Sequence, residues 1–226
     1  VIPIGLIGVA VLIGRFEPAP HRAGGSTDQT PRFAAPTGAI MVLVGVTLSA
    51  MLLEGASMDW SAIYMRNIFN PGPFMTGIAV ACFAFSQGAM RFFADGFVER
   101  HSPEGVARVL LGILLVGTLI VFLPVVPQLS LLGFALCGVG TSALFPLAVS
   151  AAAQRTDRPA VINVAAFAQN SFVIFLLGPP LLGGVAQEWG IRWSFGIGLP
   201  LIILSFVLAH ALGKKPVPHD EVVPAE

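Results

Sequence analysis

Charged side chains are scarce in this sequence. Twelve Lys and Arg and twelve Asp and Glu residues make up only 11% of its 226 residues, whereas soluble domains usually carry about 25%. Hydrophobic residues make up 55%, and the mean hydropathy is +0.85. This composition excludes an ordinary soluble domain and predicts an integral membrane protein. The two charge signs cancel, so there is no basic surface for the phosphates of a nucleic acid.

Residues with catalytic or metal-binding chemistry are also few. The two cysteines, Cys82 and Cys137, lie inside apolar runs and do not suggest a disulfide framework. The His and Cys residues show no metal-ligand spacing, and neither a phosphate-binding glycine loop nor a converging Ser, His and Asp set is present. The sequence therefore predicts a protein that is not an enzyme and uses no metal or cofactor.

Long apolar runs dominate what the sequence does contain. Residues 1–14 are apolar but reach only about 21 Å as a helix, less than the roughly 30 Å of a bilayer core, so we interpret them as the end of a truncated spanning helix. Residues 15–37 contain four prolines and a Gly24-Gly25 pair, which predicts a flexible linker. Six apolar segments of about 17 to 26 residues follow, at 38–58, 74–90, 105–123, 129–151, 160–185 and 194–212.

These segments predict an all-α fold. A backbone in lipid must satisfy its polar groups within each segment, so we expect a polytopic transmembrane bundle of six full spanning helices and a partial N-terminal one. The expected divisions are the truncated helix (1–14), a cytoplasmic linker (15–37), a six-helix transmembrane domain (38–212) and a cytoplasmic tail (213–226).

Basic residues predict the orientation of the bundle. If the linker is cytoplasmic, only Arg66 and Arg192 fall on the opposite side. Ten against two is a strong positive-inside signal, which places the linker and the C-terminus in the cytoplasm. The ten residues on the linker side are Arg15, Arg22, Arg32, Arg91, Arg100, Arg108, Arg155, Arg158, Lys214 and Lys215.

One carboxylate lies clearly inside an apolar segment. Glu54 comes about 24 Å after Gly38 along a helix, which places it in the outer third of the bilayer core. A charge at that depth costs roughly 2.5 to 3.5 kcal/mol on insertion scales. We interpret Glu54 as a candidate for proton coupling, with Asp59 one turn later as a second. The alternatives are an ion partner for a neighbouring helix at Glu54 and a cap or solvated loop residue at Asp59.

Amide side chains form a second group of candidates. Asn163 and Asn170 share a face of one predicted helix, with Gln169 beside Asn170 near the midplane, and Gln87 lies in the inner third of another segment. All four are candidates for contact with a transported solute. The alternative is ordinary hydrogen bonding between helices, worth about 0.6 kcal/mol on average.

Two motifs carry a resemblance to a known family. Arg91-Phe-Phe-Ala-Asp95-Gly-Phe-Val-Glu99-Arg100 resembles the loop motif Gly-x-x-x-Asp-Arg-x-x-Gly-Arg of the major facilitator superfamily, between helices eight and nine. It departs from that motif because Arg91 replaces the leading Gly and Gly96 replaces the basic residue after Asp95. Pro180-Leu-Leu-Gly183-Gly184 is similar to the Pro-x-x-Gly-Gly part of another motif of the family, here in the eleventh helix. With the six spans after a long linker, the chain resembles the C-terminal half of such a bacterial transporter.

A third stretch points to a subgroup. Glu54-Gly-Ala-Ser-Met-Asp59-Trp60-Ser-Ala-Ile-Tyr64 is similar to the seventh-helix signature of a bacterial subgroup that contains a rhizopine-transport-like membrane protein. The superfamily resemblance covers essentially the whole chain, with residues 1–14 as the remnant of the sixth helix.

The resemblance implies a function. It implies a secondary transporter of the inner membrane that moves a small solute by alternating access, with proton coupling, and whose N-terminal half is the missing partner of this chain. It implies a gating role for Arg91, Asp95 and Arg100 in a cytoplasmic loop. The alternatives are a drug-like efflux pump and a six-helix scaffold or channel.

Overall fold

The computed structural model describes residues 34–98 and 101–213, without the side chains of 94–98. Every element in this part of the chain is helical. The elements are α2 (Gly38–Phe69), α3 (Pro73–Val98), α4 (Pro103–Phe122), α5 (Pro127–Thr141), α6 (Leu144–Ala153), α7 (Ala160–Trp189), α8 (Ile191–Gly196), α9 (Gly198–Leu208) and the short 3-10 helix η1 (Ala209–Gly213).

Six stretches of helix are long and apolar enough to cross a membrane. Four are the single helices α2, α3, α4 and α7, and two are composite: α5 with α6 forms one span, and α8 with α9 and η1 forms another. The predicted all-α bundle with six full spans is therefore confirmed. The predicted partial helix at 1–14 and most of the linker and tail lie outside the described residues.

Two helices run further than their apolar segments. Helix α2 ends at Phe69 rather than Met58, and α3 continues through Arg91 to Val98. Charged residues lower the local hydropathy there, but neither stretch contains a proline that would interrupt the helix. The end of α2 has a local cause, because Asn70 adopts the left-handed conformation with φ of 44°.

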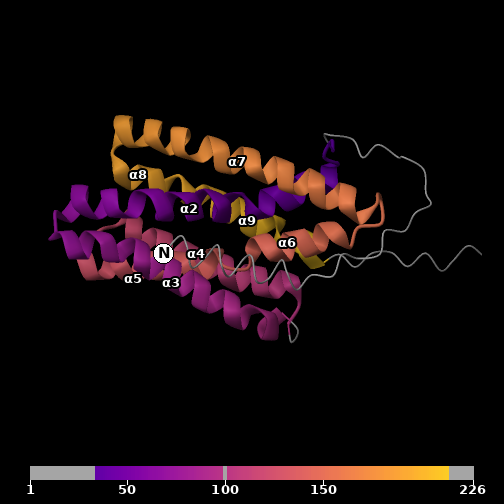
Figure 1. The fold of residues 1–226 in the computed structure, drawn as a ribbon, viewed down its shortest axis with the longest axis horizontal. Helices are drawn as coiled ribbons and strands as arrows, with labels where there is room; N and C mark the ends of the chain where they lie inside the picture. Colours follow the sequence, from indigo (N-terminus) through magenta and orange to yellow (C-terminus); the bar gives the residue numbers. More distant parts are fainter. Residues whose placement is uncertain (1–33, 99–100, 214–226) are drawn as a thin grey trace, which may run out of the picture. The chain divides into compact units, whose positions relative to one another are not determined.

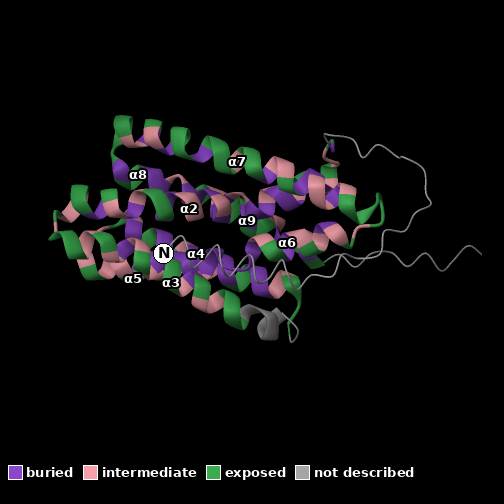
Figure 2. Ribbon diagram, viewed as in Figure 1, coloured by how far each residue is buried: buried purple, intermediate pink, exposed green. Residues whose placement is uncertain are grey.

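Helix α2 lies at the centre of the bundle. It packs against α3 on one side and α7 on the other, and also contacts α5, α6 and α9 (Figure 1). In its most apolar stretch 56% of residues are buried, against 17% in α3 and 22% in α7. Figure 2 shows these exposed positions along α7 and α3. Helices α3 and α7 are therefore the least buried of the six spans.

Glycines allow α5 to approach two neighbours very closely. A Cβ at Gly117 of α4 would lie 2.8 Å from the carbonyl oxygen of Gly133 in α5. A Cβ at Gly138 of α5 would lie 2.3 Å from the carbonyl oxygen of Phe83 in α3. Small residues bring helices together in membranes, where packing replaces the hydrophobic effect as a driving force. Helix α5 is thereby fixed between α3 and α4.

Polar and aromatic contacts stabilise the bundle at the C-terminal end of α4. The Tyr64 hydroxyl donates a hydrogen bond to the carbonyl of Val121, and its ring packs edge-on against Phe134 and Phe195. The Arg192 side chain donates to the carbonyl of Phe122 at 3.0 Å. Both contacts satisfy carbonyls that the end of a helix leaves without partners.

Candidate functional site

An ion pair joins two spans. Nη2 of Arg91 on α3 lies 3.3 Å from Oε1 of Glu54 on α2. The family motif implied that Arg91 lies in a loop, but the residue is helical because α3 continues through it to Val98. The alternative role considered for Glu54, an ion partner for a neighbouring helix, is what its contact with Arg91 provides. The Asp95 side chain and Arg100 lie outside the described residues.

The pair lies near the middle of helix α2. Helix α4 has 20 residues and is about 30 Å long, the thickness of a bilayer core. Tyr64 contacts Val121 close to the end of α4, and Glu54 precedes Tyr64 by about 15 Å along α2. The expected position in the outer third was measured on a segment that ended at Met58; on the full helix Glu54 is the 17th of 32 residues, and its depth in the membrane stays a prediction.

The same guanidinium reaches a break in a third span. Arg91 Nε donates to the carbonyl oxygen of Ser142 at 3.1 Å, where α5 ends and before α6 begins. In a continuous helix this carbonyl would accept from the N–H of residue 146. Residue 146 is proline, which has no N–H. Arg91 therefore supplies the donor that Pro146 lacks.

More side chains of α3 bond to α5 beside this contact. Ser86 Oγ donates to the carbonyl of Ala135 at 2.7 Å, and Gln87 Nε2 donates to Oγ1 of Thr141 at 3.2 Å. Gln87, a predicted solute contact, is buried with only 7% of its surface exposed. With Arg91, these residues form a polar seam along the α3 and α5 interface.

The ion pair is accessible from outside the described bundle. The Arg91 side chain is 50% exposed and the Glu54 side chain 27%. Next to Glu54 along the chain, Gly55 lines a shallow groove between α2 and α7 whose walls are mainly apolar. Hydropathy did not predict this groove, although the small residues of α2 and α7 are its signal in the sequence. It is lined by Met51, Leu52, Gly55, Ala56, Ile174, Phe175, Gly178, Pro179 and Leu182.

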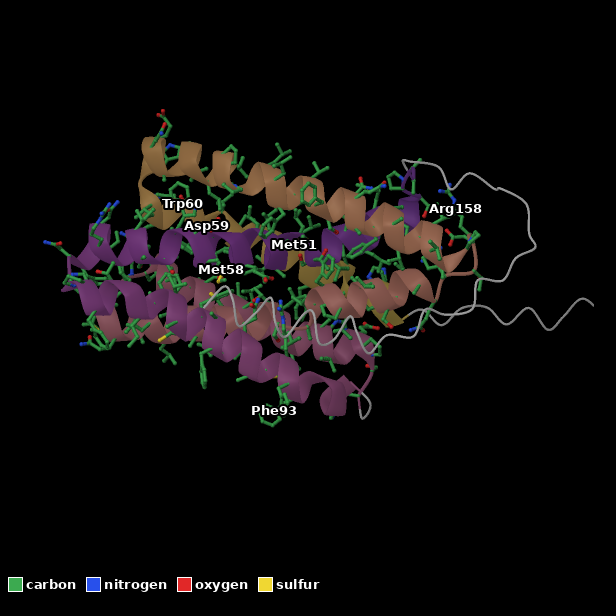
Figure 3. The ribbon with its side chains drawn as sticks, viewed as in Figure 1. Met51, Met58, Asp59, Trp60, Phe93 and Arg158 are labelled. Atoms are coloured by element: carbon green, nitrogen blue, oxygen red, sulfur yellow. The ribbon has the colours of Figure 1, made fainter. Side chains whose placement is uncertain are left out.

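Asp59 lies apart from the pair. It is exposed on α2, and it forms no ion pair or hydrogen bond within the part of the chain that the structure describes. Figure 3 shows it beside Met58 and Trp60. Trp60 packs on α7, where a Cβ at Gly183 would lie 3.4 Å from its ring. Asp59 is thus an uncompensated carboxylate within α2, which extends to Phe69.

The three amides of α7 lie in the first half of that helix, and each forms a hydrogen bond within the chain. Gln169 Oε1 accepts from the backbone N–H of Ala34 at 3.1 Å, and Asn170 Nδ2 donates to the carbonyl of Ala166 at 2.8 Å. Buried Asn163 donates to Oδ1 of Asp157 at 2.9 Å. These amides do not join Gln87, because α3 and α7 lie on opposite sides of α2.

The turn between α6 and α7 holds the chain just before α2. Arg158, labelled in Figure 3, donates to the carbonyl of Ala35 at 2.8 Å. Partial burial of Asp157 is outweighed by its hydrogen bond from Asn163 and by the charge of Arg155, which together hold the pKa of this carboxyl below its usual value. Asp157 and Arg158 of the turn, with Asn163 and Gln169 of α7, therefore form a polar clamp around Ala34 and Ala35.

Comparison with known proteins identifies the family. The model of the Major Facilitator Superfamily matches residues 34–226. The chain belongs to the major facilitator superfamily. As a member of this family of transporters it is a multi-pass membrane protein and not an enzyme, as predicted. Within the described residues, no group of three or more His, Cys, Asp or Glu could hold a metal ion.

Relatives of this superfamily member come from several bacteria. It is 28% identical to an uncharacterized MFS-type transporter of Yersinia pestis over 85% of this chain and 50% of that protein. It is 32% identical to the uncharacterized transporter y4wD of Sinorhizobium fredii over 76% of this chain and 46% of that one. It is 24% identical to the membrane protein MosC of Rhizobium meliloti over 62% of this chain and 35% of that one. The chain spans about half the length of the curated relatives it matches, and the subgroup proposed from Glu54 to Tyr64 stays a prediction.

Proposed function

We propose that this chain is the C-terminal half of a secondary transporter, which moves a small solute across the bacterial inner membrane by alternating access. In such proteins two halves rock about a site near the midplane. The proposed partner is an N-terminal half that covers the faces of α2, α3 and α7 left exposed by the described bundle. The relatives' names favour transport over a scaffold or channel.

The 3.3 Å contact between Glu54 and Arg91 is the observation that supports a transport mechanism. Each charge alone would cost roughly 2.5 to 3.5 kcal/mol at the centre of a bilayer, and pairing offsets part of that cost. We propose that Glu54 binds the coupling proton. Protonation would remove its attraction for Arg91, and a state in which the pair is hydrated would bind that proton differently from a state in which it is not.

The test is Glu54→Gln in the full-length transporter. The variant keeps the size and hydrogen bonding of the side chain but cannot titrate. In proteoliposomes, a panel of radiolabelled sugars, polyols, amino acids and amines is first screened for accumulation driven by an imposed pH gradient. For the solute that accumulates, we expect Glu54→Gln to abolish gradient-driven accumulation while counterflow without a gradient continues.

Glu104 provides a matched control. It is paired with Arg108 at 2.8 Å in the first turn of α4, away from the middle of the span, so Glu104→Gln should leave both activities intact. Normal gradient-driven accumulation by the Glu54→Gln protein would rule out the coupling role. Screening inverted and right-side-out vesicles in parallel separates uptake from the drug-like efflux alternative. The roles of Asp59, Asp95 and Arg100 in coupling or gating stay predictions.

A further inference from the structure

The break between α5 and α6 lacks one backbone donor. Thr141 ends α5 and Leu144 begins α6. Pro146 cannot donate to the carbonyl of Ser142, and its ring also crowds that carbonyl, so the helix is interrupted here. In a membrane, a carbonyl without a partner costs several kcal/mol. The conformation at this break therefore depends on which group donates to Ser142.

Arg91 is that donor, and it contacts Glu54 at the same time. Its Nε donates to the Ser142 carbonyl at 3.1 Å, while its Nη2 lies 3.3 Å from Oε1 of Glu54. A planar guanidinium offers its donors in a fixed geometry. A carboxylate that holds Nη2 therefore also orients Nε toward the break.

We propose that Arg91 transmits the charge state of Glu54 to the bend between α5 and α6. Ionised Glu54 holds the guanidinium on the Ser142 carbonyl and so fixes the bend. Neutral Glu54 releases the guanidinium, and the break samples other conformations. Arg91 is thus a positioning residue for a hinge. The proposal rests on the proposed function only in naming a proton as the agent that neutralises Glu54.

Few other charges can act on Glu54. The helices α5, α6 and α9, which pack against α2, contain no Asp, Glu, Lys, Arg or His. Helix α7 carries only Glu188, next to its last residue, and α8 carries Arg192 beside the end of α4. The 3-10 helix η1 carries His210, whose ring is hydrogen-bonded to the carbonyl of Val207. Helix α3 also carries Asp95, one turn after Arg91, whose side chain lies outside the described residues. On α2 itself, Asp59 lies more than one turn away. Arg91 is therefore the charged group in contact with Glu54 among the described side chains.

Distances across the break test the proposal. Spin labels at Leu132→Cys on α5 and Ser150→Cys on α6, both exposed, lie about 27 Å apart along the helix axis. Cys82 and Cys137 are replaced by alanine, and the full-length transporter is studied in nanodiscs by pulsed electron paramagnetic resonance. We expect the distance distribution to shift or broaden when the pH is lowered from neutral.

Three variants separate the proposal from a general effect of acid. Glu54→Gln should show the acid distribution at every pH. Pro146→Ala restores the backbone N–H for Ser142 and should remove the pH response even though Glu54 and Arg91 are intact. Glu104→Gln should respond like the parent. Glu54→Gln and Pro146→Ala are small changes, so the test needs no substitution of Arg91 itself, whose loss would leave both Glu54 and the Ser142 carbonyl without their partner.

The outcomes also distinguish this inference from the proposed function. If Glu54→Gln keeps the parent distribution at neutral pH, or if Pro146→Ala keeps the full pH response, the hinge link is refuted. Should Glu54→Gln still lose gradient-driven accumulation, proton coupling stands and reaches the helices by another route. Should it accumulate solute normally but lose the pH response, the hinge link stands and the coupling role of Glu54 fails.

Discussion

The close contact between α3 and α5 makes Gly138→Ala a sharp test of the packing. The added Cβ would lie 2.2 Å from Ser86 Oγ and 2.3 Å from the carbonyl oxygen of Phe83. The hydroxyl can rotate away, but the backbone carbonyl cannot. A carbon normally stays about 3.3 to 3.6 Å from a carbonyl oxygen, so the two helices must separate by about 1 Å.

The magnitude follows from what that separation breaks. Overpacking of this kind costs about 1 to 3 kcal/mol. Separation also lengthens the 2.7 Å bond from Ser86 to the Ala135 carbonyl, and such bonds are worth about 0.6 kcal/mol in a membrane protein. The helix preference of alanine over glycine offsets about 1 kcal/mol of this loss, so we expect Gly138→Ala to lower the free energy of unfolding by about 1 to 3 kcal/mol. Gln87 and Arg91 lie along the same face, so their bonds to Thr141 and Ser142 should weaken too.

The assay is unfolding of the protein in mixed micelles by sodium dodecyl sulfate, followed by tryptophan fluorescence. Gly88→Ala on α3 is the matched control, because nothing lies within 4 Å of its added Cβ and alanine is favoured over glycine in a helix by about 1 kcal/mol. Adding Ser86→Ala to Gly138→Ala should recover only part of the loss, since the Phe83 carbonyl remains. Equal stability of Gly138→Ala and Gly88→Ala would show that the helices do not approach so closely.

Three further expectations concern the ends of the bundle. Because the pKa of Asp157 is lowered in the folded state, the ionised carboxylate stabilises the fold above its ordinary pKa of 3.8, and that contribution disappears as the pH falls through the folded-state value. Asp157→Asn should therefore lower the melting temperature at neutral pH, with a difference that vanishes in acid. Gln169→Ala should speed hydrogen exchange at the Ala34 amide, which it bonds, whereas Asn170→Ala should not; equal effects would contradict the clamp. Reporter fusions near Gly24 and Pro216 should both report the cytoplasm, and a signal from the other side at either position would overturn the assigned orientation.

The six spans could be predicted from the sequence, but the ends of two could not. Apolar length alone located each span, because a membrane requires about 20 apolar residues for a helix to cross it. The same criterion ended α2 at Met58 and α3 before Arg91. Hydropathy measures where a helix is apolar, whereas a helix ends where hydrogen bonding ends. The left-handed Asn70, followed by Pro71, stops α2 at Phe69, and those residues were the better signal.

The sequence singles out the important polar side chains, but it does not show which groups they contact. Glu54 stands out as a carboxylate in an apolar segment, but its ion partner depends on how far α3 extends. Gln169 bonds to Ala34, 135 positions earlier in the chain, and no local pattern encodes that contact. Both amides predicted near the midplane were placed by counting along one helix, which gives their depth without giving the neighbouring chain.

One long-range contact did have a local signal in the sequence. Pro146 leaves the carbonyl of Ser142 without its usual donor, and in lipid that carbonyl requires another. A donor must come from a neighbouring helix at the same depth, and a long cationic side chain within a span is well suited because it also needs acceptors. Arg91 meets this condition once α3 is extended, and its second contact with Glu54 then follows from the need to pair its charge. A proline inside a predicted span, taken together with an unexplained arginine and glutamate in neighbouring spans, therefore predicts a three-helix contact that hydropathy alone does not.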